Sequence, residues 1–193
     1  VLTPAGEDFW IADGPVVQFF AVLPYPTRMA VVRLGDGGLW VWSPIALDDA
    51  LAADYQRIAA ACRAAVGPDF VLMVDVQYAW DDVERALRTL KDWKDLDIYF
   101  IETPLQIDDL AGYARLHDES PVPVAAGEWQ NTRFEFIDLM DIGKVDIAQP
   151  DVGRVGGLTE ALRVCDLAAE RGRRIIPHCW KTGISIAASA HLA

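Results

Sequence analysis

Hydrophobic and polar positions change their pattern near residue 45. Before it, apolar runs at Val16–Leu23, Met29–Leu34 and Leu39–Trp42 are separated by Pro24-Tyr25-Pro26 and Gly35-Asp36-Gly37-Gly38. Short apolar runs between Pro-rich and Gly-rich breaks are typical of antiparallel strands joined by turns. Residues 1–45 are therefore predicted to form a short antiparallel β meander.

Beyond Ser43–Asp48 the pattern becomes a regular alternation of strands and helices. Strands are predicted at 71–76, 97–101, 122–126, 145–148 and 174–177, and helices at 48–65, 81–90, 108–117, 132–142, 158–171 and 183–193. Val71–Val76 is a continuous apolar run, as in a strand buried on both faces. Strands that alternate with helices in this way favour a parallel α/β fold, so residues 46–193 are predicted to form a second, α/β domain.

Each of the five predicted strands is followed by an acidic residue or a histidine. These residues are Asp75 in VDVQ, Glu102 in IETP, Glu128 in AAGE, Asp151 in QPDVG and His178 in IPHC. The spacing of 23 to 27 residues corresponds to one strand and helix at each step. Because parallel strands end at the same edge, these side chains are expected to meet where α/β folds place their sites.

Three of these side chains, Asp75, Glu102 and Glu128, are carboxylates on successive strands. Carboxylates that converge raise one another's pKa unless a cation lies between them, and oxygen ligands suit a hard ion such as Mg²⁺. The alternative is that each carboxylate caps a helix or lies in a loop, as is common after a strand. The repetition on three consecutive strands favours the metal site.

Asp151 and His178 follow the last two strands. A carboxylate on one ring nitrogen fixes the tautomer of a histidine and raises its basicity, which suits proton transfer. The alternative is a structural histidine that is bonded to the backbone. A position beside Asp151 at the same edge favours the His–Asp dyad.

The charge balance argues against some classes of function. There are 29 acidic and 17 basic side chains, a net charge of -12, and no apolar stretch as long as a membrane helix. Nucleic-acid and membrane partners are therefore not expected. Three cysteines outside any CxxC motif, with no positive charge before Arg28, lead us to expect a cytoplasmic protein.

The motifs VDVQ, IETP, AAGE, QPDVGRVGG and IPHCWKTG make residues 48–193 resemble the enolase superfamily, specifically its mandelate racemase-like branch. The resemblance implies an incomplete (β/α)8 TIM barrel that corresponds to about strands three to seven. It also implies Mg²⁺ bound by Asp75, Glu102 and Glu128, with His178 as general base or acid oriented by Asp151. The implied chemistry begins with removal of the proton α to the carboxylate of a hydroxy or sugar acid.

The resemblance also bears on the outcome of the reaction. The family's second strand, which carries a catalytic lysine, has no counterpart in this sequence, so dehydration by one base is expected before racemisation or epimerisation by two. The alternative is a catalytically inactive, truncated or hybrid remnant of such an enzyme. Residues 1–45 are similar instead to the start of a metallo-β-lactamase-like family of unknown function, through IADGP, YPTRM and LWVWSPIAL.

Other residues near these motifs complete the expected site. Gln77 is expected to face the same way as Asp75, while Trp129 and Lys181 closely follow Glu128 and His178 and are candidate substrate contacts. Arg154 and its neighbouring glycines do not match a phosphate-loop spacing, so we interpret them as a tight turn. An open set of parallel strands exposes two edges. The N-terminal strands could cover one of them; otherwise a homo-oligomer is expected.

Overall fold

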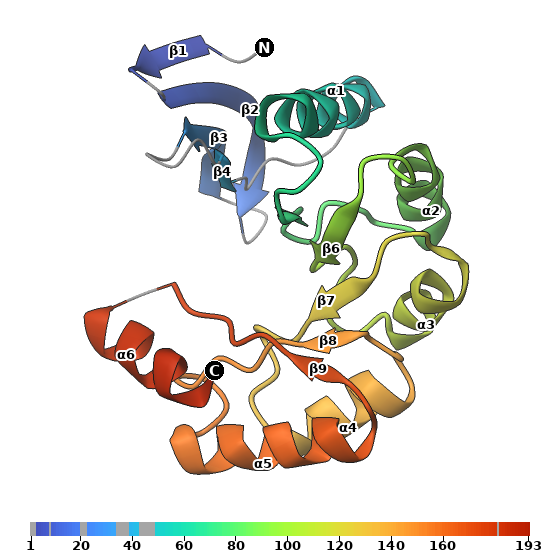
Figure 1. The fold of residues 1–193 in the computed structure, drawn as a ribbon, viewed down its shortest axis with the longest axis vertical. Helices are drawn as coiled ribbons and strands as arrows, with labels where there is room; N and C mark the ends of the chain where they lie inside the picture. Colours follow the sequence, from blue (N-terminus) through green and yellow to red (C-terminus); the bar gives the residue numbers. More distant parts are fainter. Residues whose placement is uncertain (1–2, 8, 20–22, 34–38, 43–48, 181) are drawn as a thin grey trace.

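The computed structural model describes residues 3–193 except 8, 20–22, 34–38, 43–48 and 181 (Figure 1). It contains a four-stranded antiparallel sheet and a five-stranded parallel sheet. The first sheet runs in the order β1 (Thr3–Gly6), β2 (Phe9–Phe19), β3 (Leu23–Arg33) and β4 (Leu39–Trp42). The predicted antiparallel meander is confirmed.

The break predicted at Pro24-Tyr25-Pro26 is wrong, because β3 continues through it. Both prolines pair with β2, Pro24 opposite Gln18 and Pro26 opposite Val16. The pairing between β3 and β4 covers Ala30–Arg33. Neither Pro24 nor Pro26 therefore has a β4 residue opposite it. A proline has no N–H to donate and is tolerated at such an edge.

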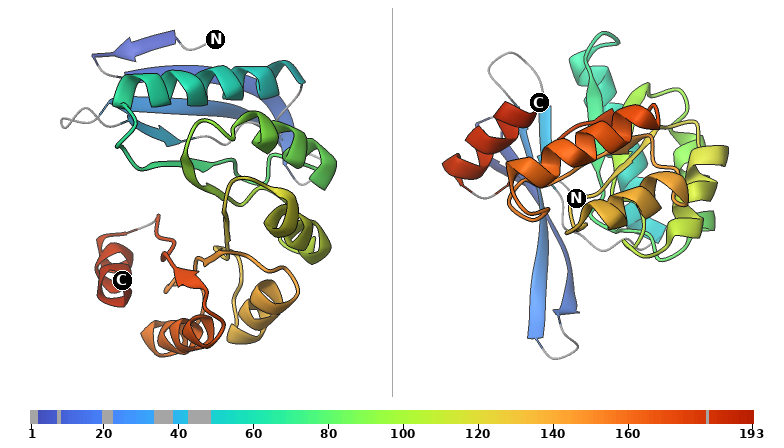
Figure 2. Two further views of the ribbon diagram at one scale, coloured as in Figure 1. Left: turned by 45° about the vertical axis from the view of Figure 1, so that its right-hand side comes forward. Right: turned by 90° about the horizontal axis from the view of Figure 1, so that it is seen from below.

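The second sheet has the order β5-β6-β7-β8-β9, and all four of its pairings are parallel. In chain order, the elements of this part are α1 (Asp49–Val66), β5 (Leu72–Asp75), α2 (Val83–Asp92), β6 (Ile98–Glu102), α3 (Leu110–Glu119), β7 (Val124–Ala126), α4 (Arg133–Asp141), β8 (Ile147–Ala148), α5 (Leu158–Glu170), β9 (Arg174–Ile175) and α6 (Gly183–Leu192). Helices α2 to α5 follow one another around the outside of the sheet, and the strands form an open arc (Figures 1 and 2). The α/β fold predicted from the sequence, an incomplete barrel, is confirmed.

Side-chain caps fix where several helices begin after their strands. Asp82 and Asp109 accept backbone N–H groups in the first turns of α2 and α3. Thr132 and Glu135 form a reciprocal capping box at the start of α4. Each cap satisfies backbone donors that a helix start leaves unpaired, and so fixes the residue at which the helix begins and the loop from the strand ends. These loops carry the candidate site residues.

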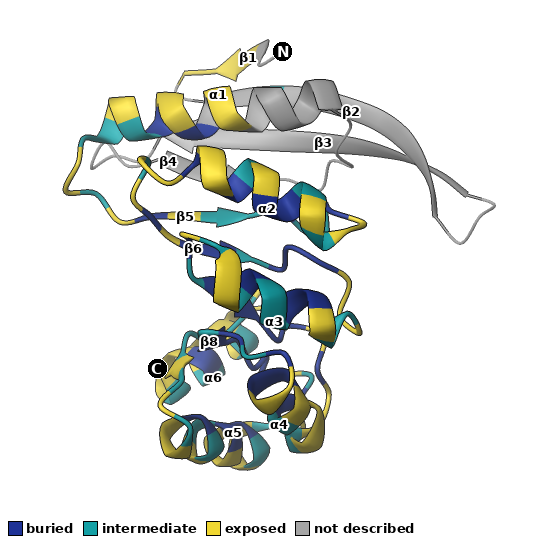
Figure 3. Cartoon of the chain, turned by 90° about the vertical axis from the view of Figure 1, so that its right-hand side faces the viewer, coloured by how far each residue is buried: buried dark blue, intermediate teal, exposed yellow. Residues whose placement is uncertain are grey.

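The main core lies between the parallel sheet and its outer helices. Its largest fully buried side chains include Trp80, Trp93, Tyr113 and Phe136. Figure 3 shows buried residues on the sheet-facing side of α2 and α3 and exposed residues on the outside. Helix amphipathicity therefore determines which face of the sheet the helices cover. Among the described residues, none of the helices is both long and apolar enough to cross a membrane.

The inner face of the arc differs from one strand to the next. Phe100, Ala125 and Ile147 form a small buried cluster on β6, β7 and β8. On β5, however, Met73 is 49% exposed, whereas Leu72 packs into the main core. The expectation that Val71–Val76 is buried on both faces is therefore wrong. β5 is the first strand of this sheet, and its residue Met73 stays open to solvent within the described part of the chain.

Candidate active site

The five residues expected from the sequence lie at the carboxyl ends of the five parallel strands. Asp75 and Glu102 are the last residues of β5 and β6, and Glu128 follows β7 by two residues. Asp151 and His178 extend β8 and β9 as an isolated parallel bridge. Each strand therefore delivers one polar side chain to the same edge, as expected for parallel strands.

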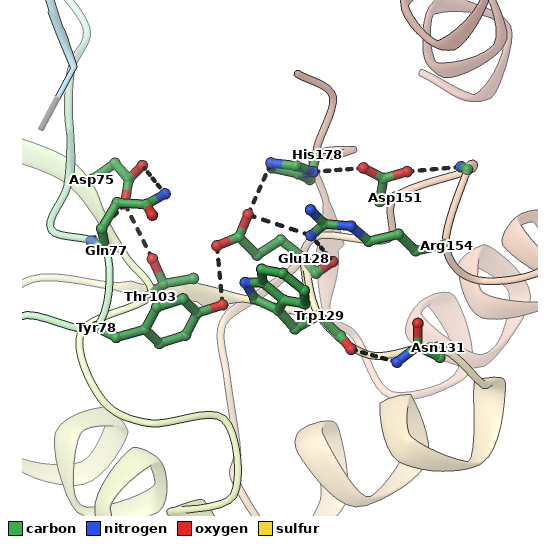
Figure 4. A network of polar contacts seen from close by, with 11 residues as sticks. Asp75, Gln77, Tyr78, Thr103, Glu128, Trp129, Asn131, Asp151, Arg154 and His178 are labelled. Atoms are coloured by element: carbon green, nitrogen blue, oxygen red, sulfur yellow. Dashed lines mark hydrogen bonds and ion pairs between the residues drawn. The ribbon is translucent and has the colours of Figure 1, made fainter. Parts of the chain in front are cut away.

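Asp151, His178 and Glu128 form a continuous chain of contacts (Figure 4). The Nδ1 atom of His178 lies 2.8 Å from Oδ2 of Asp151, and its Nε2 atom lies 2.9 Å from Oε2 of Glu128. The Glu128 residue is 4% exposed and the His178 side chain 11% exposed. Asp151 is held in turn by the backbone N–H of Gly153 at 2.7 Å. The imidazole is fixed from both sides in a largely dry environment.

These contacts favour the charged forms of His178 and Glu128. Burial alone would lower the pKa of His178, but its hydrogen bonds to Glu128 and Asp151 raise it above the ordinary value. Burial alone would raise the pKa of Glu128, but the hydrogen bond and charge of His178, with the Tyr78 hydroxyl and Arg154, lower it. The contacts therefore stabilise the imidazolium and the carboxylate relative to the neutral pair.

Two further side chains contact Glu128. The Tyr78 hydroxyl donates to Oε1 at 2.9 Å. The guanidinium of Arg154 donates to the Glu128 carbonyl oxygen at 2.7 Å and lies 3.7 Å from Oε2. It also lies over the Trp129 ring, 4.1 Å from the ring centroid. The expectation that Arg154 belongs to no more than a tight turn is incomplete, because its side chain reaches the site.

Asp75 is surrounded by neutral donors from the neighbouring loops. Oδ1 accepts the Gln77 backbone N–H at 2.9 Å and the Thr103 hydroxyl at 3.1 Å, and Oδ2 accepts the Gln77 amide at 3.1 Å. Burial raises the pKa of Asp75, and these hydrogen bonds only partly oppose the rise. Gln77, Tyr78 and Thr103 all have positive φ angles, an unusual backbone for residues other than glycine. Such strain is concentrated at functional sites.

Glu102 has the most strongly altered carboxyl group of the site. Burial first, and then the charge of Asp75, raise the pKa of Glu102 to about 7, although a hydrogen bond from the buried side chain of Gln149 opposes the rise. The other amide atom of Gln149, Oε1, is buried without a hydrogen-bond partner. Gly127 allows the backbone of Gln149 to approach closely, because a Cβ at this position would lie 2.9 Å from the Gln149 backbone nitrogen.

The donor set fits a magnesium ion in its chemistry. The three carboxylates Asp75, Glu102 and Glu128 offer only oxygen ligands. A cation between them would reduce their mutual electrostatic repulsion. Within the described part of the chain, no three His, Cys, Asp or Glu side chains are gathered closely enough to hold a metal ion. Glu128 faces His178 and Tyr78 instead, so metal binding requires its Oε2 atom to leave His178.

The candidate substrate contacts are placed differently from one another. Gln77 is bonded to Asp75, and Trp129 is 47% exposed beside Arg154 at the edge of the site. Lys181 lies outside the described residues. Sequence reasoning missed the contributions of Tyr78, Thr103, Gln149 and Arg154. These residue types do not identify a site without knowledge of their neighbours. In the sequence, however, Tyr78 follows Asp75 by three positions and Gln149 precedes Asp151 by two, so both lie close to predicted site residues.

Comparisons with known proteins show which family this chain resembles in sequence. Residues 32–193 match the model of the family described as enolase C-terminal domain-like. The D-galactarolactone cycloisomerase of Agrobacterium fabrum is 39% identical over 69% of this chain and 35% of its own length. The L-talarate/galactarate dehydratase of Salmonella typhimurium is 38% identical over 66% of this chain and 31% of its own length. The chain thus spans about a third of the length of these relatives.

Solved structures show the same relationship. The 3,6-anhydro-D-galactonate cycloisomerase of Zobellia galactanivorans superposes with a TM-score of 0.71 at 35% identity, over 73% of this chain and 40% of the other. The L-talarate/galactarate dehydratase structure from Salmonella typhimurium gives a TM-score of 0.66 at 34% identity, over 73% of this chain and 35% of the other. Sequence and fold agree, and the chain belongs to the enolase C-terminal domain-like family.

Proposed function

We propose that this chain supplies the metal-binding carboxylates and the proton-transferring dyad of a Mg²⁺-dependent enzyme that removes the proton α to the carboxylate of a sugar acid. The contact chain Asp151–His178–Glu128 at the carboxyl edge of the sheet carries the proposal. The relatives support the substrate class, because their names describe a dehydratase and two cycloisomerases that act on sugar acids or sugar lactones.

Each residue has a defined part in this proposal. Asp75, Glu102 and Glu128 would hold Mg²⁺, which when bound supplies positive charge beside the substrate carboxylate and so acidifies its α-proton. Once Glu128 has released Nε2, the imidazole would lose its Nε2 proton to solvent. The neutral His178 then accepts the α-proton at this nitrogen. Asp151 keeps Nδ1 protonated and fixes the plane of the ring.

Dehydration is the outcome we propose for the proton that His178 has taken. The same imidazolium can return its proton to a leaving β-hydroxyl on the same face, so one acid–base group is sufficient. Trp129 offers an exposed ring beside Arg154 at the site edge, and we assign both Trp129 and Gln77 to substrate contacts, with Lys181 as a third. The three cysteines are free thiols, which fits a reducing cytoplasm.

Incubation with a panel of sugar acids in D₂O tests the proposal. We expect the protein with Mg²⁺ to place deuterium at the α-carbon of at least one acid, as read by NMR of the recovered acid and product. H178N should slow this exchange by about 100-fold or more.

His117 offers the matched control, because its Nδ1 atom lies 2.9 Å from Oδ1 of Asp146 in a second His–Asp pair before β7 and β8, away from the carboxyl edge. H117N should exchange at the rate of the unchanged protein. If the folded protein incorporates no deuterium from any acid, the alternative applies, namely a catalytically inactive remnant of such an enzyme.

A further inference from the structure

Tyr78 connects two strand ends that lie far apart in the sequence. Its hydroxyl donates to Oε1 of Glu128 at 2.9 Å, from the loop after β5 to the loop after β7 (Figure 4). Its backbone N–H donates to the carbonyl oxygen of Thr103 at 2.7 Å, in the loop after β6. One residue therefore fixes the relative positions of three successive strand-end loops.

The backbone around Tyr78 is built for this contact. Tyr78 has a φ of 59° and Gln77 a φ of 48°, two consecutive non-glycine residues in the left-handed region. This conformation is costly for such residues and persists where surrounding contacts enforce it. Here it allows the Gln77 amide to reach Asp75 and the Tyr78 hydroxyl to reach Glu128.

The two carboxylate oxygens of Glu128 have different partners. Oε1 accepts the Tyr78 hydroxyl, while Oε2 lies 2.9 Å from Nε2 of His178. Arg154 approaches Oε2 only to 3.7 Å, beyond hydrogen-bond length, and gives its short bond to the Glu128 carbonyl. Tyr78 is thus the donor that sets which oxygen faces the dyad, and it does so without bringing a positive charge.

We propose that Tyr78 is a positioning residue: because it holds Oε1 of Glu128 and bridges the loops after β5, β6 and β7, it sets the orientation in which this carboxylate would meet a divalent cation. The inference rests on the metal site of the proposed function. A neutral donor suits this task, because it orients the carboxylate and leaves its negative charge available for the ion. Partners that orient a metal ligand typically change metal affinity by about 10- to 100-fold.

Titration with Mn²⁺, followed by EPR, tests the inference without any need for turnover. Tyr78→Phe removes the hydroxyl alone, and we expect it to weaken Mn²⁺ binding by about tenfold or more. We also expect an altered Mn²⁺ line shape, because the Glu128 carboxylate then loses the hydrogen bond that fixes its orientation. Melting followed by circular dichroism should show that the variant stays folded.

Tyr113→Phe is the matched control. The Tyr113 hydroxyl is buried in the core and donates to the carbonyl oxygen of Leu105 at 2.8 Å. Its loss should lower the melting temperature and leave Mn²⁺ affinity and line shape unchanged. Tyr99→Phe, at an exposed tyrosine of β6, should change neither property.

The outcomes separate this inference from the proposed function. If the unchanged protein binds no Mn²⁺, the metal site of the proposed function fails. If the unchanged protein binds Mn²⁺ and Tyr78→Phe binds it with the same affinity and line shape, the positioning role is overturned and the metal site stands. Equal weakening in Tyr113→Phe would also overturn it, because the effect would then follow general stability.

Discussion

The two halves of the parallel sheet differ in the partners of their carboxylates and in the burial of their inner-face residues. On β7, β8 and β9, Glu128 and Asp151 both contact His178, Arg154 lies 3.7 Å from Glu128, and the inner-face residues Ala125 and Ile147 are buried. On β5 and β6, Asp75 and Glu102 accept hydrogen bonds from neutral groups, and their pKa values are raised. The inner face of β5 is open at Met73.

This difference shows which half depends on something outside the chain. The β7–β9 half has two basic side chains, His178 and Arg154, for its two carboxylates. In the β5–β6 half, Asp75 is bonded to neutral donors and the charge of His178 only partly opposes the rise in the pKa of Glu102, so a bound ion would stabilise this half most. We therefore expect Mg²⁺, pH and substitutions to act unequally on the two halves.

The largest expected effect comes from Glu102. Its pKa is about 7 in the folded chain against an ordinary 4.5, so the folded state binds this proton more tightly. The free energy of unfolding should therefore decrease as the pH rises from about 4.5 to above 7, by about 3 kcal/mol from this group. Glu102→Gln should remove that loss and melt at a higher temperature than the unchanged protein at pH 8.

Mg²⁺ supplies the second half of this test. At pH 8 it should raise the melting temperature of the unchanged protein, because an ion replaces the missing proton, and should act much less on Glu102→Gln. Asp108→Asn, at an exposed loop residue, serves as the control and should keep the pH slope of the unchanged protein. Identical slopes for Glu102→Gln and the unchanged protein would show that Glu102 carries no such penalty.

The next effect is expected in the β7–β9 half, at the His178–Asp151 pair. Its hydrogen bond raises the pKa of His178, so Asp151→Asn should lower the pH at which His178 titrates in NMR spectra. Deuterium exchange at the α-carbon should fall by up to about 100-fold.

The second histidine–aspartate pair gives the comparison for this variant. Asp146 contacts His117 and accepts the backbone N–H of Val124 at 2.8 Å, so Asp146→Asn should lower the melting temperature. It should leave the titration of His178 and the exchange rate unchanged. If both variants slowed exchange equally, the effect would be one of stability and not of orientation.

The sequence predicted the parts of this comparison that depend on period and order. Apolar runs alternating with amphipathic stretches placed every parallel strand and its helix, because a strand and a helix bury different spacings of residues. The strand-end positions of Asp75, Glu102, Glu128, Asp151 and His178 followed from strand direction alone. The antiparallel meander followed from the turn-rich start of the chain, but the predicted apolar runs began at Val16 and missed β1.

Other features depended on contacts that the order of residues does not contain. The Tyr78 hydroxyl meets Glu128 from 50 positions away, and the Gln149 amide meets Glu102 across an intervening strand. The exposure of Met73 depends on what covers the inner face of β5, and the course of β3 through Pro24 depends on where β4 pairs. Periodicity reports which face a side chain is on, but not what lies opposite.

The smallest expected effect concerns the open inner face of β5. Met73 is exposed there, on the strand that ends in Asp75. Because exposed apolar surface favours contact with another chain, we expect self-association in sedimentation velocity across a range of concentrations. Met73→Glu should weaken it by about 5- to 10-fold, roughly the free energy of part of one apolar side chain. Ile142→Glu, at an exposed residue after α4, should leave it unchanged. A monomer at every concentration would contradict the expectation. It would mean that the inner face of β5 stays exposed to water without driving association.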